Sequence, residues 1–149
     1  MTFVRAKVIN KERVVRRIER LPEEARVEVG RAMRASALAL ETEMKRSIQG
    51  GPKSGVVYEK YRPRRTHRAS APGQPPATDT GRLAGSIGHE VDADGLGATV
   101  AANAHYAAPL EFGTLRMAAR PFMGRALRKL RGRIERFVSE AIRAATRKR

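Results

Sequence analysis

The most informative part of the chain is residues 79–122, which read DTGRLAGSIGHEVDADGLGATVAANAHYAAPLEFGTLRMAARPF. Two short runs at 89–91 and 98–102 are separated by a turn rich in Asp and Gly at 92–97, and this pattern predicts a β-hairpin. Long amphipathic patterns precede and follow this part. We therefore expect an α+β fold, in which a long N-terminal helix and a C-terminal helix pack on a small antiparallel β-sheet, with a long basic loop between them.

Two capped turns border the predicted hairpin. Before it, the side-chain oxygen of Thr80 or Asp79 can accept the free backbone N–H groups of a short helix that runs through Ile87. After it, residues 106–112 read as one or two helical turns, ended by Gly113 in the left-handed conformation. These turns would give the hairpin stiff corners.

Glu111 is the acidic residue with the most unusual surroundings. Leu110 and Phe112 flank it and would partly bury its carboxylate, which then needs a hydrogen-bonded partner. One interpretation is an ion pair with Arg82 or Arg120 that holds the loop geometry. The other is a solvated carboxylate at a helix end.

Both flanking segments have helical periodicity, and proline can occupy the first turn of each helix, as Pro22 and Pro121 would here. The first apolar stripe is Val29, Met33, Ala37, Leu40, Met44 and Ile48. The second is Phe122, Ala126, Leu130, Ile134, Phe137, Ala141 and Ala145. We expect one domain, 1–149, made of 1–21 (N-terminal arm and short helix), 22–49 (long helix), 50–78 (basic, proline-rich loop), 79–120 (hairpin core with two capped turns) and 121–149 (C-terminal helix).

The composition limits the classes of function. A chain of 149 residues can bury a real core without disulfides or metals. Cysteine is absent, which excludes a disulfide scaffold and a Cys nucleophile. No apolar run is long enough for a membrane span, so we expect a soluble protein that has no membrane partner.

The charge is high and unevenly distributed. The formal net charge is +16, which points to a polyanion or an acidic protein surface as a neighbour. Residues 82–114 carry one basic and four acidic side chains, whereas residues 51–81 carry six and two and residues 115–149 carry twelve and two. This pattern could let copies of the chain attract one another.

The loop expected at 50–78 has no helical period and contains a possible strand at 56–58. A structureless loop of this length is usually functional or disordered, so it is either an interaction loop that orders on assembly or a passive linker. Its basic side chains are the candidate contacts to a partner or to DNA: Lys60, Arg62, Arg64, Arg65 and Arg68.

No pattern in the chain predicts catalysis, a metal site or a cofactor. The three histidines, His67, His89 and His105, lack ligand spacing, and no serine lies in a nucleophile elbow. An enzyme such as a nuclease would need acidic metal ligands that the chain does not offer. A small basic protein that contacts only the nucleic-acid backbone is an alternative, although the aromatics are few and not interleaved with the basic residues.

Several short motifs, in this order and spacing, resemble those of the tail-completion or head–tail joining (neck) proteins of long-tailed bacteriophages, which occur also in prophages and gene transfer agents. The resemblance covers roughly residues 29–145. The motif residues, which would form structural and interface turns, are Asp79, Thr80, Gly81, Arg82, Leu83, Tyr106, Glu111, Phe112, Gly113, Thr114, Pro121 and Phe122.

The resemblance implies a structural virion protein at the neck, made in the host cytoplasm and assembled as a homo-oligomeric ring, most simply a hexamer, around the DNA channel. Its partners would be head-side stopper or adaptor proteins and tail-tube or terminator proteins, with DNA passing close by. A tail terminator ring is the alternative role within the same class. The resemblance carries over no catalytic residues.

Overall fold

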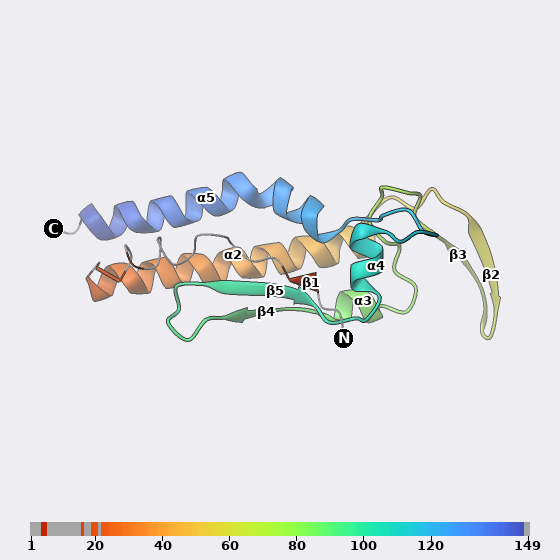
Figure 1. The fold of residues 1–149 in the computed structure, drawn as a ribbon, viewed down its shortest axis with the longest axis horizontal. Coiled ribbons are helices and arrows are strands. Elements are labelled where there is room, and N and C mark those ends of the chain that lie inside the picture. The colour runs from red at the N-terminus through yellow and green to blue at the C-terminus, as the bar shows by residue number, and fades with distance from the viewer. Residues whose placement is uncertain (1–3, 6–15, 17–18, 21, 148–149) are drawn as a thin grey trace.

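The protein is elongated, and the computed structural model describes residues 4–5, 16, 19–20 and 22–147. Its two long helices lie side by side in opposite directions (Figure 1). The helices are α2 (Glu23–Gly50), α3 (Arg82–Gly85), α4 (Ala107–Phe112) and α5 (Met123–Arg147). The strands are β1 (Val4–Arg5), β2 (Val57–Tyr61), β3 (Arg64–Arg68), β4 (Ile87–Val91) and β5 (Ala98–Ala102).

The body of the molecule has three layers. Strands β1, β5 and β4 form an antiparallel sheet in that order. Helix α2 lies between this sheet and α5 (Figure 1). The predicted α+β class is therefore confirmed, with α5 packed chiefly on α2 rather than on the sheet.

Helix α2 begins with a favourable first turn and buries one apolar stripe. Glu23 and Glu24 place negative charge at the positive end of the helix dipole. The buried side matches the predicted stripe, except that Met33 is only partly buried. The helix ends at Gly50, one residue beyond the expected end. The buried residues of α2 are Ala25, Val29, Ser36, Ala37, Leu40, Met44 and Ile48.

The main core lies where α2, the start of α5 and the sheet meet. Phe122 and Met44 are both 0% exposed there. Full burial of a side chain of this size is worth about 1.5–3 kcal/mol. At the edge of the core, Lys129 Nζ lies 2.5 Å from Glu43 Oε1 and joins α5 to α2. The crossing of the two helices is therefore held by apolar packing and by an ion pair.

The hairpin of β4 and β5 forms as predicted, and its register places Ile87 opposite Ala102. Backbone hydrogen bonds close the turn rich in Asp and Gly between the strands. His89 of β4 contacts the carboxylate of Glu41 on α2. That hydrogen bond, with a second one from Lys45, lowers the pKa of the Glu41 carboxyl below its ordinary value of 4.5. The sheet is thus tied to α2 by a charged contact as well as by packing.

Much of the segment expected to be a loop is instead a second β-hairpin, β2 and β3, which we call the arm (residues 57–68). Its strands pair antiparallel from Val57 opposite Arg68 to Tyr61 opposite Arg64. The arm projects from one end of the body (Figure 1). The expectation of a loop was wrong here because most of these residues are exposed on both faces, so no alternation of apolar and polar residues marks the second strand.

The N-terminal arm and short helix expected at 1–21 are separate from the arm at 57–68. They lie mostly outside the described residues. The described pair Val4–Arg5 forms β1 and lies against β5, with Val4 opposite Ala102.

The burial of α2 predicts unequal effects of two identical substitutions. Leu40 is 6% exposed and Leu38 is 54% exposed on the same helix. We expect Leu40→Ala to lower the free energy of unfolding by about 2–5 kcal/mol, because it leaves a cavity, and Leu38→Ala to change it by less than about 0.5 kcal/mol. Urea denaturation followed by circular dichroism measures both, and equal losses would contradict the packing described.

Candidate functional site

The turn predicted at Asp79 and Thr80 forms, but without the expected side-chain cap. Helix α3 starts after Gly81, which has φ 76° and ψ −6°, and neither Thr80 nor Asp79 caps it with a side chain. The helix ends at Gly85, and Ile87 already belongs to β4. A residue in the left-handed region costs little only when it is glycine, so Gly81 sets the direction in which the chain enters the helix.

Asp79 holds the arm instead of capping α3. Its carboxylate contacts Lys60 Nζ, lies 2.9 Å from a terminal nitrogen of Arg65, and is 3.9 Å from His67 Nδ1. The hydrogen bond from Lys60, with the nearby positive charges, lowers the pKa of the Asp79 carboxyl. Two of the five predicted basic contacts are thus used inside the chain, and this was missed because the partners are 19 and 14 residues apart in sequence.

An open cavity of about 420 Å³ lies between the base of the arm, α3 and α4. Tyr58 and His67 line it from the arm, and Ile48 and Leu110 line it from the body. Its walls gather many of the residues singled out from the sequence: Asp79, Thr80, Gly81, Arg82, Leu83, Tyr106 and Arg120. The structure therefore brings the first turn and Tyr106 together around one depression.

The carboxylate of Glu111 accepts three hydrogen bonds, and its partner is a helix terminus. The buried carboxylate accepts backbone N–H groups from Phe122 at 2.8 Å, Met123 at 3.0 Å and Gly124 at 2.8 Å. These are free donors at the start of α5, where the helix dipole also favours an anion. Glu111 therefore caps α5 from a distance in sequence.

The expected ion pair of Glu111 with Arg82 or Arg120 is wrong. Arg120 donates its Nε–H to the carbonyl of Ser70 at 3.3 Å, and its backbone N–H bonds the carbonyl of Leu110 at 2.7 Å. Three backbone donors already satisfy the Glu111 carboxylate. A guanidinium is not needed there.

The second turn is tight and depends on Gly113, which ends α4 as predicted. Its φ is 79° and its ψ is −179°, a combination that essentially only glycine adopts and that differs from the expected left-handed helical conformation. A Cβ at this position would lie 2.8 Å from the carbonyl oxygen of Met117. The turn is closed by the N–H of Thr114, which bonds that same oxygen at 2.8 Å.

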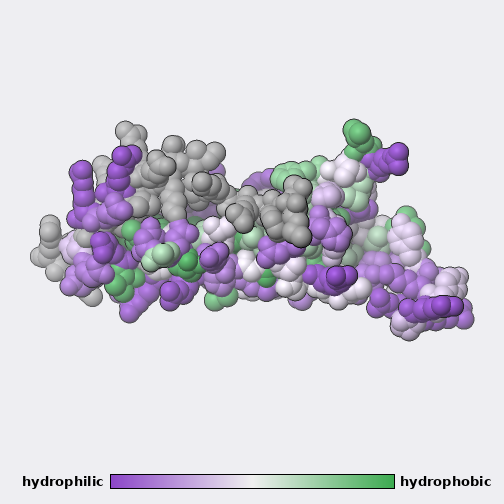
Figure 2. Space-filling model, turned by 60° about the horizontal axis from the view of Figure 1, so that its bottom comes forward, coloured by the Kyte–Doolittle hydropathy of each residue, from purple (hydrophilic) through white to green (hydrophobic). Residues whose placement is uncertain are grey.

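This turn presents two large apolar side chains to solvent. Phe112 is 73% exposed, and Leu115 is fully exposed. Figure 2 shows hydrophobic atoms projecting at the end of the molecule that carries the arm. Leu115 was not singled out from the sequence. A large apolar residue directly after the turn residues Gly113 and Thr114 could have indicated an exposed side chain. We call residues 112–117 the apolar turn.

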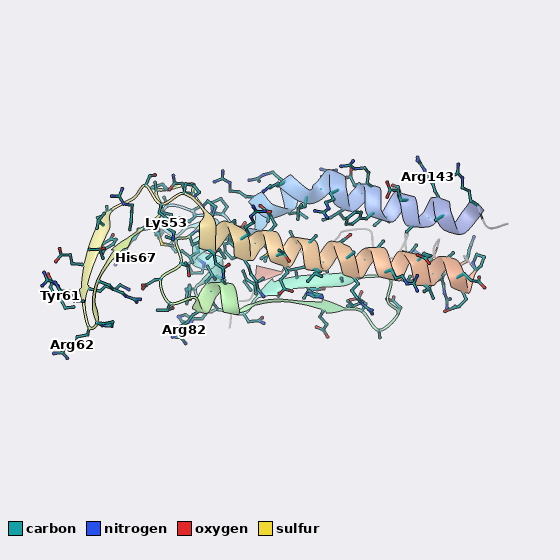
Figure 3. All side chains as sticks on the ribbon, turned by 180° about the vertical axis from the view of Figure 1, so that it is seen from behind. Lys53, Tyr61, Arg62, His67, Arg82 and Arg143 are labelled. Carbon is teal, nitrogen blue, oxygen red and sulfur yellow. The ribbon has the colours of Figure 1, made fainter. Side chains whose placement is uncertain are left out.

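The remaining basic residues of the arm are not among the partners of Asp79. Tyr61 and Arg62 lie at the far end of the arm, whereas His67 lies on the side that faces the body (Figure 3). Among the described residues, no partner is found for Arg62, Arg64 or Arg68, all of which are exposed. They remain candidate contacts to a partner or to DNA.

The described residues contain no cluster of three or more His, Cys, Asp or Glu side chains that could hold a metal ion. Within the same part of the chain, the helices fall short of the length and apolar character that a membrane crossing requires. Two features protrude at this end of the molecule, the arm and the apolar turn, and the open cavity lies at the base of the arm.

The cap of α5 predicts that removing the Glu111 carboxylate lowers the stability of the protein strongly. We expect Glu111→Ala to lower the free energy of unfolding by about 2–3 kcal/mol, since it removes charge-assisted hydrogen bonds and leaves the donors of α5 unpaired. Glu140→Ala, at an exposed position of α5, is the control and should cost less than about 0.5 kcal/mol. A thermal or urea unfolding curve that does not distinguish the two variants would refute the cap.

The contacts of Asp79 predict how firmly the arm is held. Asp79→Asn removes the negative charge that attracts Lys60 and Arg65, so trypsin should cut the arm several-fold faster while the rest of the chain resists. Asp94→Asn is the control, because its Oδ1 accepts only a local N–H, from Leu96. Mass spectrometry of the first fragments gives the rates, and identical rates in both variants would contradict the role of Asp79.

The comparisons with known proteins agree with the resemblance seen in the motifs. The model of the HK97 gp10-like family, described as "Bacteriophage HK97-gp10, putative tail-component", matches residues 12–113. That range contains α2, the arm, the cavity-lining turns, the β4–β5 hairpin and α4, and stops at Gly113. No curated protein and no solved structure matches the chain. Because the match covers more than half of the 149 residues, the chain belongs to the HK97 gp10-like family of bacteriophage tail components.

Proposed function

We propose that this tail component is a structural subunit of the phage neck that completes the tail and joins it to the head. Copies of the chain would form a closed ring around the DNA channel in the virion, after synthesis in the host cytoplasm. The ring would contact head-side stopper or adaptor proteins on one face and tail-tube or terminator proteins on the other. No step of this role requires catalysis.

The observation that carries the proposal is the apolar turn and its support. Phe112 and Leu115 are exposed on a turn that the buried Glu111 carboxylate joins to the start of α5. An apolar side chain held on a rigid turn loses little conformational entropy on binding, which is how the anchors of protein interfaces gain their affinity. A joining protein needs such anchors, whereas a monomeric soluble protein gains nothing from them.

The charge distribution supports contacts between copies of the chain. The segment 82–114 has more acidic than basic side chains, and the segments on either side of it are strongly basic. Two surfaces of opposite charge on one chain allow head-to-tail contacts, and such contacts close into a ring when the angle between neighbours is fixed. The cap of α5 and the glycine turn supply fixed angles.

The proposal predicts that Leu115→Asp separates assembly from folding. Leu115 is fully exposed, so the variant should unfold like the wild type. A buried charge at an interface anchor should weaken each contact by about 2 kcal/mol or more. In a phage whose only copy of the gene carries the variant, electron micrographs should show filled heads and free tails that are not joined.

Leu127→Asp is the matched control, because Leu127 is 40% exposed on α5 and lies outside the apolar turn. It should leave particles joined. Normal particles with Leu115→Asp would refute the role of the turn. Joined particles in a phage that lacks the whole gene would refute the proposed function itself.

A further inference from the structure

The arm has two different faces, and its register defines them. Residues directly opposite each other in an antiparallel ladder share a face. Tyr58 with His67 and Lys60 with Arg65 form the inner face, which meets Asp79 and the cavity. The outer face consists of the other three pairs: Val57 with Arg68, Glu59 with Thr66, and Tyr61 with Arg64.

The outer face is rich in groups that favour a protein partner. Val57 and Tyr61 are exposed there beside Arg64 and Arg68. Its single carboxylate, Glu59, accepts a hydrogen bond from the Tyr61 hydroxyl at 3.2 Å. Tyr and Arg are the side chains most enriched at the energetic centre of interfaces. Because a two-stranded hairpin is marginally stable alone in water, an arm of this kind gains stability when another surface covers it.

The same chain offers a complementary surface on the β4–β5 hairpin. β4 is an edge strand of its sheet among the described residues, so one side of it is open to pairing. Glu90 lies on β4, is exposed, and has no partner within the described part of the chain. Asp94, in the following turn, adds a second exposed carboxylate. The neighbouring residues Gly88 and Ala101 are small, so the face of another chain can approach the hairpin closely.

We infer that the outer face of the arm of one copy docks on the β4–β5 hairpin of the next copy, with Arg64 and Arg68 against Glu90 and Asp94. The inference rests on the proposed ring and names the contact that closes it. The arm leaves one end of the elongated body, and the β4–β5 turn lies toward the other end (Figure 1). A contact between them is head-to-tail and cannot be satisfied within one copy.

The features of the arm favour this partner over DNA. Lys60 and Arg65, two of its five basic residues, are used by Asp79, and the outer face combines two arginines with two apolar or aromatic side chains. A surface that binds only phosphates would not need Val57 exposed beside them. An acidic hairpin of the same protein matches the charge of the arm's outer face.

Cross-linking tests the contact directly, because the chain contains no cysteine of its own. Copies with Arg64→Cys are mixed with copies carrying Glu90→Cys, assembled, and oxidised. The mixture should yield disulfide-linked dimers that neither variant gives alone. The control pair replaces Arg64→Cys with Arg136→Cys, which lies exposed on α5 and should give none.

A charge swap tests the same contact without oxidation. Arg64→Glu should raise the protein concentration needed for ring assembly by about tenfold or more, and Arg64→Glu combined with Glu90→Arg should restore it. Arg136→Glu should have no effect. Analytical ultracentrifugation measures the masses of the assemblies.

The outcomes separate the two proposals. Rings that join heads to tails but give no cross-link and no rescue by the charge swap would overturn the inference and leave the proposed function intact. A protein that stays monomeric under all assembly conditions would overturn both. Loss of salt-dependent DNA retention in Arg64→Glu, with assembly unchanged, would assign the arm to nucleic acid and overturn the inference.

Discussion

A buried carboxylate facing three backbone N–H groups is the contact on which the rest of this structure depends. Removing Glu111 from water is costly unless every lone pair finds a donor, and the start of α5 supplies those donors. A Cβ on Gly124 would lie 3.0 Å from Glu111 Oε1, so glycine keeps this approach uncrowded. Because α4 and α5 meet at this point, the contact also sets where Phe122 enters the core and how α5 crosses α2.

Local patterns carried enough information to predict most elements of the body. The apolar stripe of α2 repeats at helical spacing, and the turn between β4 and β5 is rich in the residues that turns require. These signals are properties of neighbouring residues, so no knowledge of the rest of the fold is needed to read them. The α+β class follows from their order, and it is the class observed.

The candidate site was harder to predict, because its key contacts join residues far apart in sequence. Backbone N–H groups have no sequence signature, so the partner of Glu111 was sought among arginines and missed. Asp79 was interpreted as a helix cap, since aspartate before a short helix usually is one. It pairs instead with the arm, which was itself hidden because its exposed strands lack an apolar face.

The two protruding features are held by interactions of unequal strength, and this difference suits a ring subunit. The apolar turn is fixed by a buried cap and by a glycine that no other residue can replace without a clash, so its angle to the helices cannot drift. The arm is held by exposed ion pairs of Asp79, which are weak and screened by salt. In the proposed ring, a subunit built in this way would adjust its arm to the neighbouring copy while its apolar turn keeps a fixed position on the body.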